Sequence, residues 1–164
     1  MTLPSQRQSH ALILLSIIGL MGYGLYTQYI DGLDPCPLCM TQRFFYCLIG
    51  ALALLALVHS PSQAIGGKIY GGLISLAAAG GIASAGRQVW MQHLPPEQVP
   101  ACGPSLEYML ETFPFSETLK MLIQGDGNCA EVAWRFLGLS MGEWSLLWFI
   151  GFFICGAWLA IRKD

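Results

Sequence analysis

The chain has 164 residues, of which 54% are hydrophobic and only 11% are charged. A soluble domain carries about 25% charged residues, so this composition excludes an ordinary soluble protein. The formal net charge of −2 gives no indication of a nucleic-acid partner. The length suits one unit, so we expect residues 1–164 to form a single integral membrane domain of the all-α class.

Four apolar stretches contain most of the hydrophobic residues, and each is long enough to cross a bilayer. A helix rises about 1.5 Å per residue, so about 20 residues span a hydrocarbon core of roughly 30 Å. The first stretch is longer than the about 7–15 apolar residues of a signal peptide, and no small-residue cleavage site follows it. We therefore predict a four-transmembrane-helix bundle with spans at residues 11–30, 41–59, 69–86 and 144–161.

Four spans place both termini on the same side of the membrane. The short polar segments on that side have the higher density of basic residues, namely Arg7, Lys68, Arg162 and Lys163. The positive-inside rule then favours cytoplasmic termini. Loops 31–40 and 87–143 would lie outside the cytoplasm, in a compartment that permits disulfides.

The longer predicted loop, residues 87–143, is acidic and is interrupted by five prolines. Mixed apolar and charged residues at 106–115 and 119–123 predict one or two short helices on the membrane surface. The alternative is a small soluble subdomain, but about 57 residues can barely bury a core. A Gly-Asp-Gly-Asn turn at 125–128 indicates a flexible segment that can move the cysteine that follows it.

A CxxC pair, Cys36 and Cys39, lies between the first two spans, where a helix is expected to begin. Pro35 and Pro37 suit a helix entry because neither position needs an amide hydrogen. The partial positive charge of a helix N-terminus favours the thiolate form of Cys39. Arg43 follows four residues later on the same helix face, where a cation would stabilise a thiolate or polarise a quinone carbonyl oxygen. Snorkelling of Arg43 to the interface is an equally open interpretation.

A second pair, Cys102 and Cys129, lies in the long loop. A structural disulfide between them would be worth roughly 3.5 kcal/mol by the chain-entropy relation. A CxxC on the same side of the membrane favours exchange between two disulfides instead. A four-thiolate zinc site is disfavoured by the wide spacing, so we predict no metal. Cys47 and Cys155 fall inside spans and are expected to be inert.

Together these residues resemble the bacterial disulfide bond formation protein B (DsbB) family, over residues 11–161. The matching positions are Pro35 to Cys39, Arg43, Cys102, Gly127 to Glu131, Trp134, Phe136 to Leu139, Met141 and Trp144. The resemblance implies a thiol:quinone oxidoreductase of the bacterial inner membrane. Its partner would be a DsbA-type periplasmic thioredoxin-fold protein, and its cofactor a membrane quinone, either ubiquinone or menaquinone. DsbA, DsbB and quinone form the known system that keeps the bacterial periplasm oxidising.

Carried over by position, the resemblance gives each site residue a role. Cys102 would be attacked by the reduced partner, and the released Cys129 would then attack Cys36. Cys39 would be the thiolate that faces the quinone, with Arg43 at the quinone site. The residues themselves leave the order of Cys102 and Cys129 open. Some family members carry a histidine about where Gln88 stands, so this departure bears on quinone binding.

Two other functions are compatible with parts of the pattern. A vitamin K epoxide reductase-like enzyme is also a four-helix thiol–quinone protein, but that family places its loop cysteines before the CxxC. A non-catalytic membrane assembly protein stapled by structural disulfides would bind no quinone. A specialised paralogue that serves one dedicated partner is a variant of the leading hypothesis.

Overall fold

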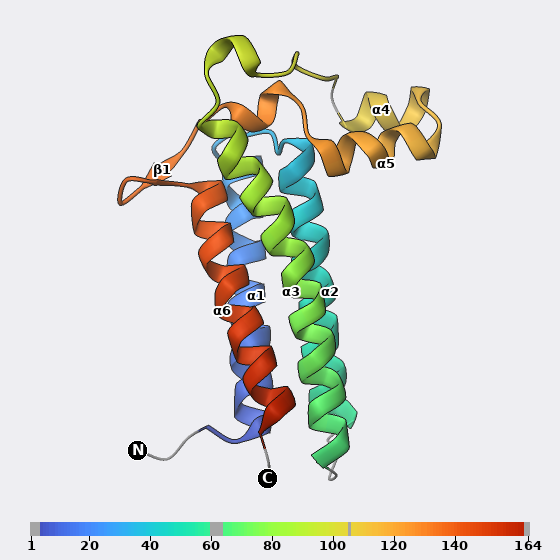
Figure 1. Cartoon of the computed structure of the whole chain (residues 1–164), viewed down its shortest axis with the longest axis vertical. Helices are drawn as coiled ribbons and strands as arrows, with labels where there is room; N and C mark the ends of the chain where they lie inside the picture. The colour runs from blue at the N-terminus through green and yellow to red at the C-terminus, as the bar shows by residue number, and fades with distance from the viewer. Residues whose placement is uncertain (1–3, 60–63, 105, 163–164) are drawn as a thin grey trace.

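The chain folds as a bundle of four long helices in a computed structural model that describes residues 4–59, 64–104 and 106–162 (Figure 1). The helices are α1 (Gln6–Tyr29), α2 (Pro37–His59), α3 (Ala64–Gln92) and α6 (Met141–Ile161). All four are long and apolar enough to cross a membrane. The predicted all-α four-helix membrane bundle is therefore confirmed. Lys163, one of the basic residues used to orient the chain, lies outside the described residues.

Two of the long helices begin at capping boxes. Ser5 accepts a hydrogen bond from the backbone N–H of Gln8, whose side chain accepts one from the Ser5 N–H. Ser140 and Glu143 form the same reciprocal pair before α6. Each box satisfies two N–H groups that lack partners within the helix. The caps explain why α1 and α6 begin several residues before the predicted apolar stretches.

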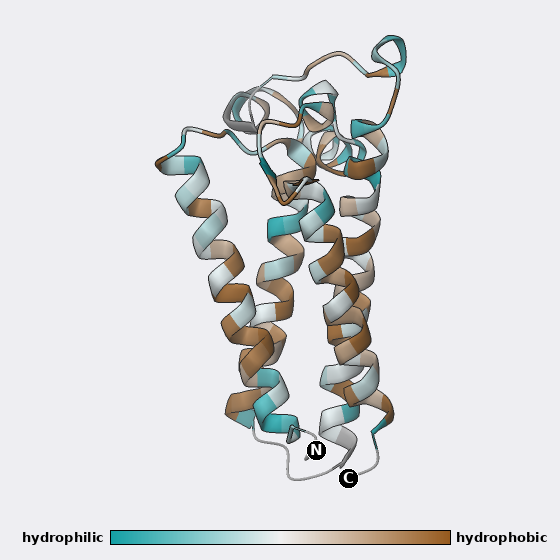
Figure 2. Cartoon of the chain, turned by 90° about the vertical axis from the view of Figure 1, so that its left-hand side faces the viewer, coloured by the Kyte–Doolittle hydropathy of each residue, from teal (hydrophilic) through white to brown (hydrophobic). Residues whose placement is uncertain are grey.

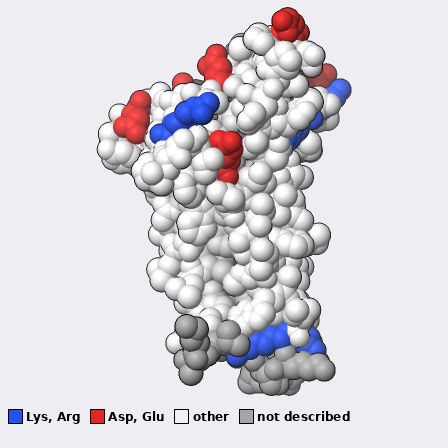
Figure 3. All heavy atoms as spheres, turned by 60° about the vertical axis from the view of Figure 1, so that its left-hand side comes forward, with Lys and Arg blue, Asp and Glu red and all other residues white. Residues whose placement is uncertain are grey.

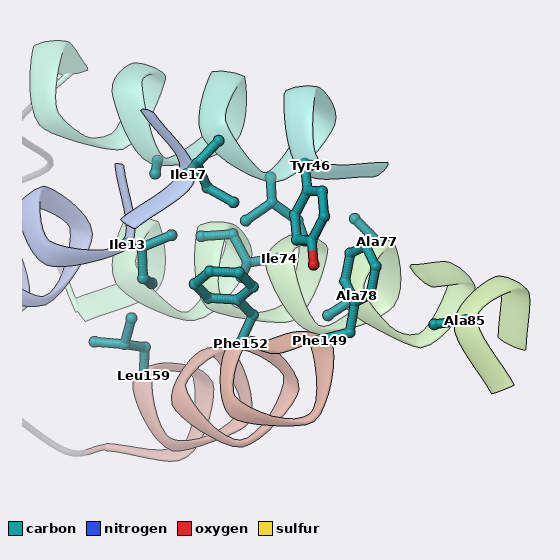
Figure 4. Packing of buried hydrophobic residues seen from close by; sticks show 12 residues of the cluster. Ile13, Ile17, Tyr46, Ile74, Ala77, Ala78, Ala85, Phe149, Phe152 and Leu159 are labelled. Atoms are coloured by element: carbon teal, nitrogen blue, oxygen red, sulfur yellow. The ribbon is translucent and has the colours of Figure 1, made fainter. Parts of the chain in front are cut away.

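The core lies along the bundle axis. Within it, α3 and α6 approach each other very closely. A Cβ atom at Gly71 would lie 2.7 Å from the Gly156 carbonyl oxygen, so these backbones approach more closely than larger residues allow. Higher in the bundle, the rings of Tyr46 and Phe149 stack with centroids 4.2 Å apart. Figure 4 shows this pair beside Ile74 in the cluster that joins the four helices.

Polarity divides the molecule into a band and two ends. Hydrophobic residues cover the length of the bundle, whereas hydrophilic residues gather at the two ends (Figure 2). Charged side chains follow the same division, because the middle of the face in Figure 3 carries none. Large apolar side chains on the outside, such as Leu15, Val58 and Leu76, are more than 60% exposed. Lipid is the environment that such a surface requires.

The end of the bundle opposite the termini carries the short elements. A 3₁₀ turn (Pro96–Gln98) is followed by α4 (Leu106–Thr112) and α5 (Phe115–Gln124), which extend sideways from the bundle in Figure 1. Phe115, Leu119 and Ile123 form an exposed apolar stripe along α5. That α4 and α5 lie on a membrane surface stays a prediction.

A small antiparallel hairpin, which the sequence analysis did not anticipate, precedes α6. Its strands are β1 (Arg135–Phe136) and β2 (Leu139–Ser140). Leu137 and Gly138 make the turn with φ of 51° and 84°, a conformation that glycine adopts readily but leucine rarely does. The Trp144 indole N–H donates to the Phe136 carbonyl at 3.0 Å, which holds the hairpin against the start of α6.

Candidate redox site

The first turn of α2 positions the CxxC pair at the end of the bundle opposite the termini. The Cys36 carbonyl accepts from the Met40 N–H at 3.1 Å, and the Cys39 N–H donates to the Cys36 sulfur at 3.3 Å. The two sulfur atoms lie 2.7 Å apart, so a small movement would bring them to the about 2.05 Å of a disulfide. Cys36 is buried and Cys39 is half-buried. All six cysteines of the chain are free thiols in the structure.

Cys129 lies against the CxxC pair, although 90 residues separate it from Cys39 in the sequence. It belongs to a 3₁₀ turn (Gly127–Ala130), which Asp126 caps by accepting from the Asn128 N–H at 3.1 Å. The Cys129 side chain is fully buried and receives a hydrogen bond from Cys36. The backbone N–H of Leu38, in the first turn of α2, also donates to the Cys129 sulfur. The loop thus places Cys129 at the N-terminus of α2.

Hydrogen bonding distinguishes the proton affinities of Cys36 and Cys129. The bond from Cys36 lowers the pKa of Cys129, although burial opposes this effect. Donation to Cys129 and to Cys39, together with burial, raises the pKa of Cys36. A hydrogen bond to a thiolate stabilises the charged form, whereas loss of a donated proton removes the bond. Cys36 therefore holds its proton more tightly than Cys129 does.

Cys102 is exposed and lies over the turn that buries Cys129. Its neighbours are bound to that turn: the Gly127 N–H donates to the Ala101 carbonyl at 3.2 Å, and the Gly103 N–H donates to Asp126 Oδ2 at 3.0 Å. The turn approaches so closely that a Cβ atom at Gly127 would be 3.1 Å from the Cys102 sulfur. The structure therefore brings all four candidate cysteines to one end of the bundle, with one of them open to solvent.

Arg43 lies one turn beyond Cys39, but its guanidinium turns towards α1. It donates to the Gln28 side-chain oxygen and, at 2.9 Å, to the Gly24 carbonyl. These acceptors are neutral, so the positive charge stays available to a ligand near the CxxC pair. The contact also joins α1 to α2.

Two buried glutamines lie beside the CxxC pair. The sequence analysis singled out Gln88 only as a departure from the family that bears on quinone binding, and it missed Gln42. Gln88 of α3 donates to the sulfurs of Cys36 and Cys39, and Gln42 of α2 donates to Gln88. For Gln42, the available signal was a polar amide inside the predicted apolar span 41–59, which is costly unless it has a partner. Which way each glutamine faces depends on the rotation of the helices, and a single sequence does not specify that rotation.

Fold and site together define a multi-pass membrane protein with a chain of neighbouring thiols. A family model described as "Disulfide bond formation protein DsbB" matches residues 6–159. Disulfide bond formation protein B of Hahella chejuensis is 50% identical over 159 residues, covering 97% of this chain and 96% of the relative. The protein of the same name from Saccharophagus degradans is 46% identical over 161 residues, covering 98% and 96%. That from Stutzerimonas stutzeri is 42% identical over 164 residues, covering 100% of both chains.

The chain belongs to the DsbB family of disulfide bond formation proteins. It is a disulfide-forming oxidoreductase, as the resemblance implied.

Proposed function

We propose that this protein reoxidises a DsbA-type periplasmic thioredoxin-fold protein and passes the electrons to a membrane quinone through two cysteine pairs. The strongest support is the placement of the two cysteine pairs, because the loop pair lies directly over the CxxC pair. Cys129 is buried in contact with Cys36, while Cys102 lies exposed over the same turn. A soluble partner can reach Cys102 alone, which favours an order that the sequence left open.

The outer half of the reaction begins with a Cys102–Cys129 disulfide. A partner thiolate attacks the Cys102 sulfur, a partner–Cys102 bond forms, and Cys129 leaves as a thiolate. The Leu38 N–H at the start of α2 stabilises that thiolate. The partner's second thiolate then attacks its own bonded sulfur and releases Cys102. The partner loses two electrons and two protons, and the Cys102 and Cys129 pair gains the electrons.

The inner half moves the same two electrons to the CxxC pair. The Cys129 thiolate attacks the Cys36 sulfur of a Cys36–Cys39 disulfide, and Cys39 leaves as a thiolate. Cys102 then attacks Cys129, which restores the outer disulfide and releases Cys36. Cys36, whose pKa is raised, takes up a proton. Contact between Cys129 and Cys36 removes the need for a large movement in this step.

The residues around Cys39 fit a quinone headgroup. Cys39 is half-buried at the edge of the apolar band, and Arg43 presents a cation held by neutral acceptors one turn away. Cys39 and Arg43 would hold the ring, and the guanidinium would supply positive charge for a carbonyl oxygen. A quinone, when bound, supplies an acceptor for two electrons and two protons. Ubiquinone and menaquinone both satisfy this chemistry.

The orientation that fits this function places both termini in the cytoplasm and the cysteines on the periplasmic side of the bacterial inner membrane. Arg7, Lys68 and Arg162 lie near the ends of helices on the side of the termini. On the face in Figure 3, the end near the termini shows basic side chains, whereas the other end shows both acidic and basic ones. This distribution is the one that the positive-inside rule favours.

The test is turnover by the purified full-length protein in detergent, with reduced DsbA-type partner and either ubiquinone or menaquinone. We expect partner oxidation and quinone reduction in equal amounts, with both lost in Cys39→Ser. Cys47→Ser is the matched control, because Cys47 lies on the outside of α2, away from the site. Partner oxidation without quinone reduction, or full turnover by Cys39→Ser, would contradict the proposal.

A further inference from the structure

Two amide side chains form a buried pair directly beside the CxxC sulfurs. Gln88 is 4% exposed and Gln42 is 3% exposed, so neither relies on bulk water for hydrogen bonds. Burial of an amide costs free energy unless its donors and acceptor are satisfied. The position of this pair therefore requires partners, and two of those partners are the sulfurs of Cys36 and Cys39.

The hydrogen bonds of the two glutamines all run the same way, from Gln42 to Gln88 and from Gln88 to the sulfurs. The Gln42 Nε2 donates to the Gln88 Oε1 at 2.7 Å. The Gln88 Nε2 then lies 3.3 Å from the Cys39 sulfur and 3.5 Å from the Cys36 sulfur. An amide has one donor end and one acceptor end, so occupying the Gln88 oxygen turns its NH₂ group towards the sulfurs. The orientation of the Gln88 amide thus depends on Gln42, which touches neither cysteine sulfur in this network.

Packing limits the movement of Gln88. A Cβ atom at Gly142 would lie 3.1 Å from the Gln88 side-chain amide, so the start of α6 passes close beside it. One turn earlier on α3, the Ser84 hydroxyl donates to the Leu38 carbonyl at 3.3 Å. That bond fixes the start of α2 against α3 and keeps the sulfurs at a constant distance from Gln88.

We propose that Gln88 is a catalytic hydrogen-bond donor to Cys39, and that Gln42 is the positioning residue that keeps the Gln88 amide turned towards the sulfur. The inference rests on the proposed function and adds two residues to its inner half. When the Cys36–Cys39 bond breaks, Cys39 leaves with the electron pair, and the Gln88 N–H stabilises the negative sulfur. No proton is transferred, because the amide N–H stays intact.

A neutral donor has a specific advantage at this place. Among the described residues, Cys36 contacts the Cys39 sulfur, Cys129 packs in the same cluster, and Arg43 lies one turn away with its guanidinium directed at α1. A hydrogen bond to a charged acceptor is stronger than one between neutral groups, more so away from water. Gln88 therefore stabilises the thiolate more than it stabilises the thiol or the disulfide.

The experiment measures the alkylation rate of Cys39 in the fully reduced, full-length protein, by iodoacetamide and peptide mass spectrometry. Neither quinone nor partner is needed, so its outcome is independent of whether the turnover assay succeeds. The first variant, Gln88→Met, keeps the length and removes the donor. Gln92→Met is the matched control, because Gln92 lies one turn further along α3 and accepts from Ser140.

Gln88→Met is expected to slow alkylation at pH 7 by about tenfold relative to wild type and Gln92→Met. At high pH, where every Cys39 is a thiolate, the rates should converge. A purely structural disturbance would instead slow the reaction at all pH values. A rate equal to that of Gln92→Met at pH 7, or a tenfold deficit that persists at high pH, would overturn the proposal.

Gln42→Met tests the positioning role. It should slow alkylation by about threefold alone and add nothing to Gln88→Met, because both changes remove one chain of bonds. Independent, multiplying effects would overturn the assignment of Gln42. If Gln88→Met does not fold, Gln88→Glu keeps the side-chain shape while placing an oxygen against the sulfur. That variant must be slower than wild type by tenfold or more at pH 7, and a wild-type rate would contradict the donor role.

Discussion

The two cysteine pairs lie at the same end of the molecule but are held in different ways. Cys36 immediately precedes a 23-residue helix and Cys39 lies in its first turn, and this helix is packed between its neighbours. Cys102 and Cys129 belong to two loop segments joined by a few hydrogen bonds, one of which ends on the Asp126 side chain. Asp126 also accepts two bonds from Asn128 within its own turn. The inner pair is fixed by the bundle, whereas the outer pair depends on the turn that holds it.

This difference matches the demands on each pair under the proposed relay. The outer pair must bond in turn to a soluble protein, to itself and to the inner pair, which requires a segment that can shift. The inner pair needs a constant position beside its hydrogen-bond donors, which a helix N-terminus provides. A local opening of the Asp126 turn would cost little compared with unfolding the bundle.

Removing one sulfur from each pair should have the largest effect and should separate the two roles. Cys39→Ser and Cys102→Ser are both expected to reduce steady-state turnover to background. Cys39→Ser, once its outer pair is oxidised, should still oxidise one equivalent of partner, because Cys102 and Cys129 remain. Cys102→Ser should oxidise none.

Rapid-quench measurement of oxidised partner per mole of protein distinguishes these outcomes. Equal single-turnover yields from the two variants would show that the pairs do not act in the proposed order.

A methyl group at Gly127 should disturb the outer pair alone. The added Cβ would lie 2.4 Å from the Pro100 carbonyl oxygen, so the segment that carries Cys102 must move. A displacement of about 1 Å at a reacting group costs up to about a hundredfold in rate, so we expect Gly127→Ala to lower turnover by about tenfold to a hundredfold. The Cys39 alkylation rate of the reduced protein should stay unchanged.

Gly86→Ala is the control for this prediction, because a Cβ at Gly86 meets nothing within 4 Å. If both variants lose turnover equally, the Gly127 turn is not what positions Cys102.

Loss of Cys36 from the inner pair should change the pKa of Cys129 in the outer pair. The hydrogen bond from Cys36 is the main cause of the lowered pKa of Cys129, so Cys36→Ala should raise that pKa. The Cys129 thiolate would then form at a higher pH, by about one unit for one lost hydrogen bond to a charged sulfur. Alkylation of Cys129 as a function of pH measures the shift.

Cys47→Ala should leave the Cys129 profile unchanged. An unshifted profile in Cys36→Ala would mean that the two sulfurs are not in contact in solution.

The smallest effect is expected at the cysteines outside the site. Cys47 lies exposed on α2 and Cys155 is half-buried on α6, and neither contacts a candidate site sulfur among the described contacts. Cys47→Ser and Cys155→Ser should each retain turnover within about twofold, with a change in unfolding free energy within about 1 kcal/mol. Strong inactivation by Cys155→Ser would extend the redox site into the bundle.

The spans and the inner pair were accessible from sequence because local features specify them. Apolar length predicts a membrane helix, and Pro37 beside Cys36 and Cys39 predicts a helix entry. The relative places of Cys102 and Cys129 were not accessible, because they depend on loop contacts such as Gly127 to Ala101.

Helix rotation limited the sequence analysis in the same way. Spacing places Arg43 on the Cys39 side of α2, but the guanidinium extends to Gly24 of α1. The Gln42–Gln88 pair requires two helices to face each other at one level, and no local pattern encodes that alignment. Local chemistry was therefore predictable, whereas partners across helices were not.

The Arg43 contact has a consequence for how the chain enters the membrane. An arginine within a membrane segment opposes insertion, by about 2.5–3.5 kcal/mol at the centre of the bilayer and by less near its edge. The two oxygens that accept from Arg43 belong to Gly24 and Gln28, which the ribosome makes before α2. The acceptors are thus already present when the second span arrives, and α1 and α2 are suited to enter the bilayer as one hairpin.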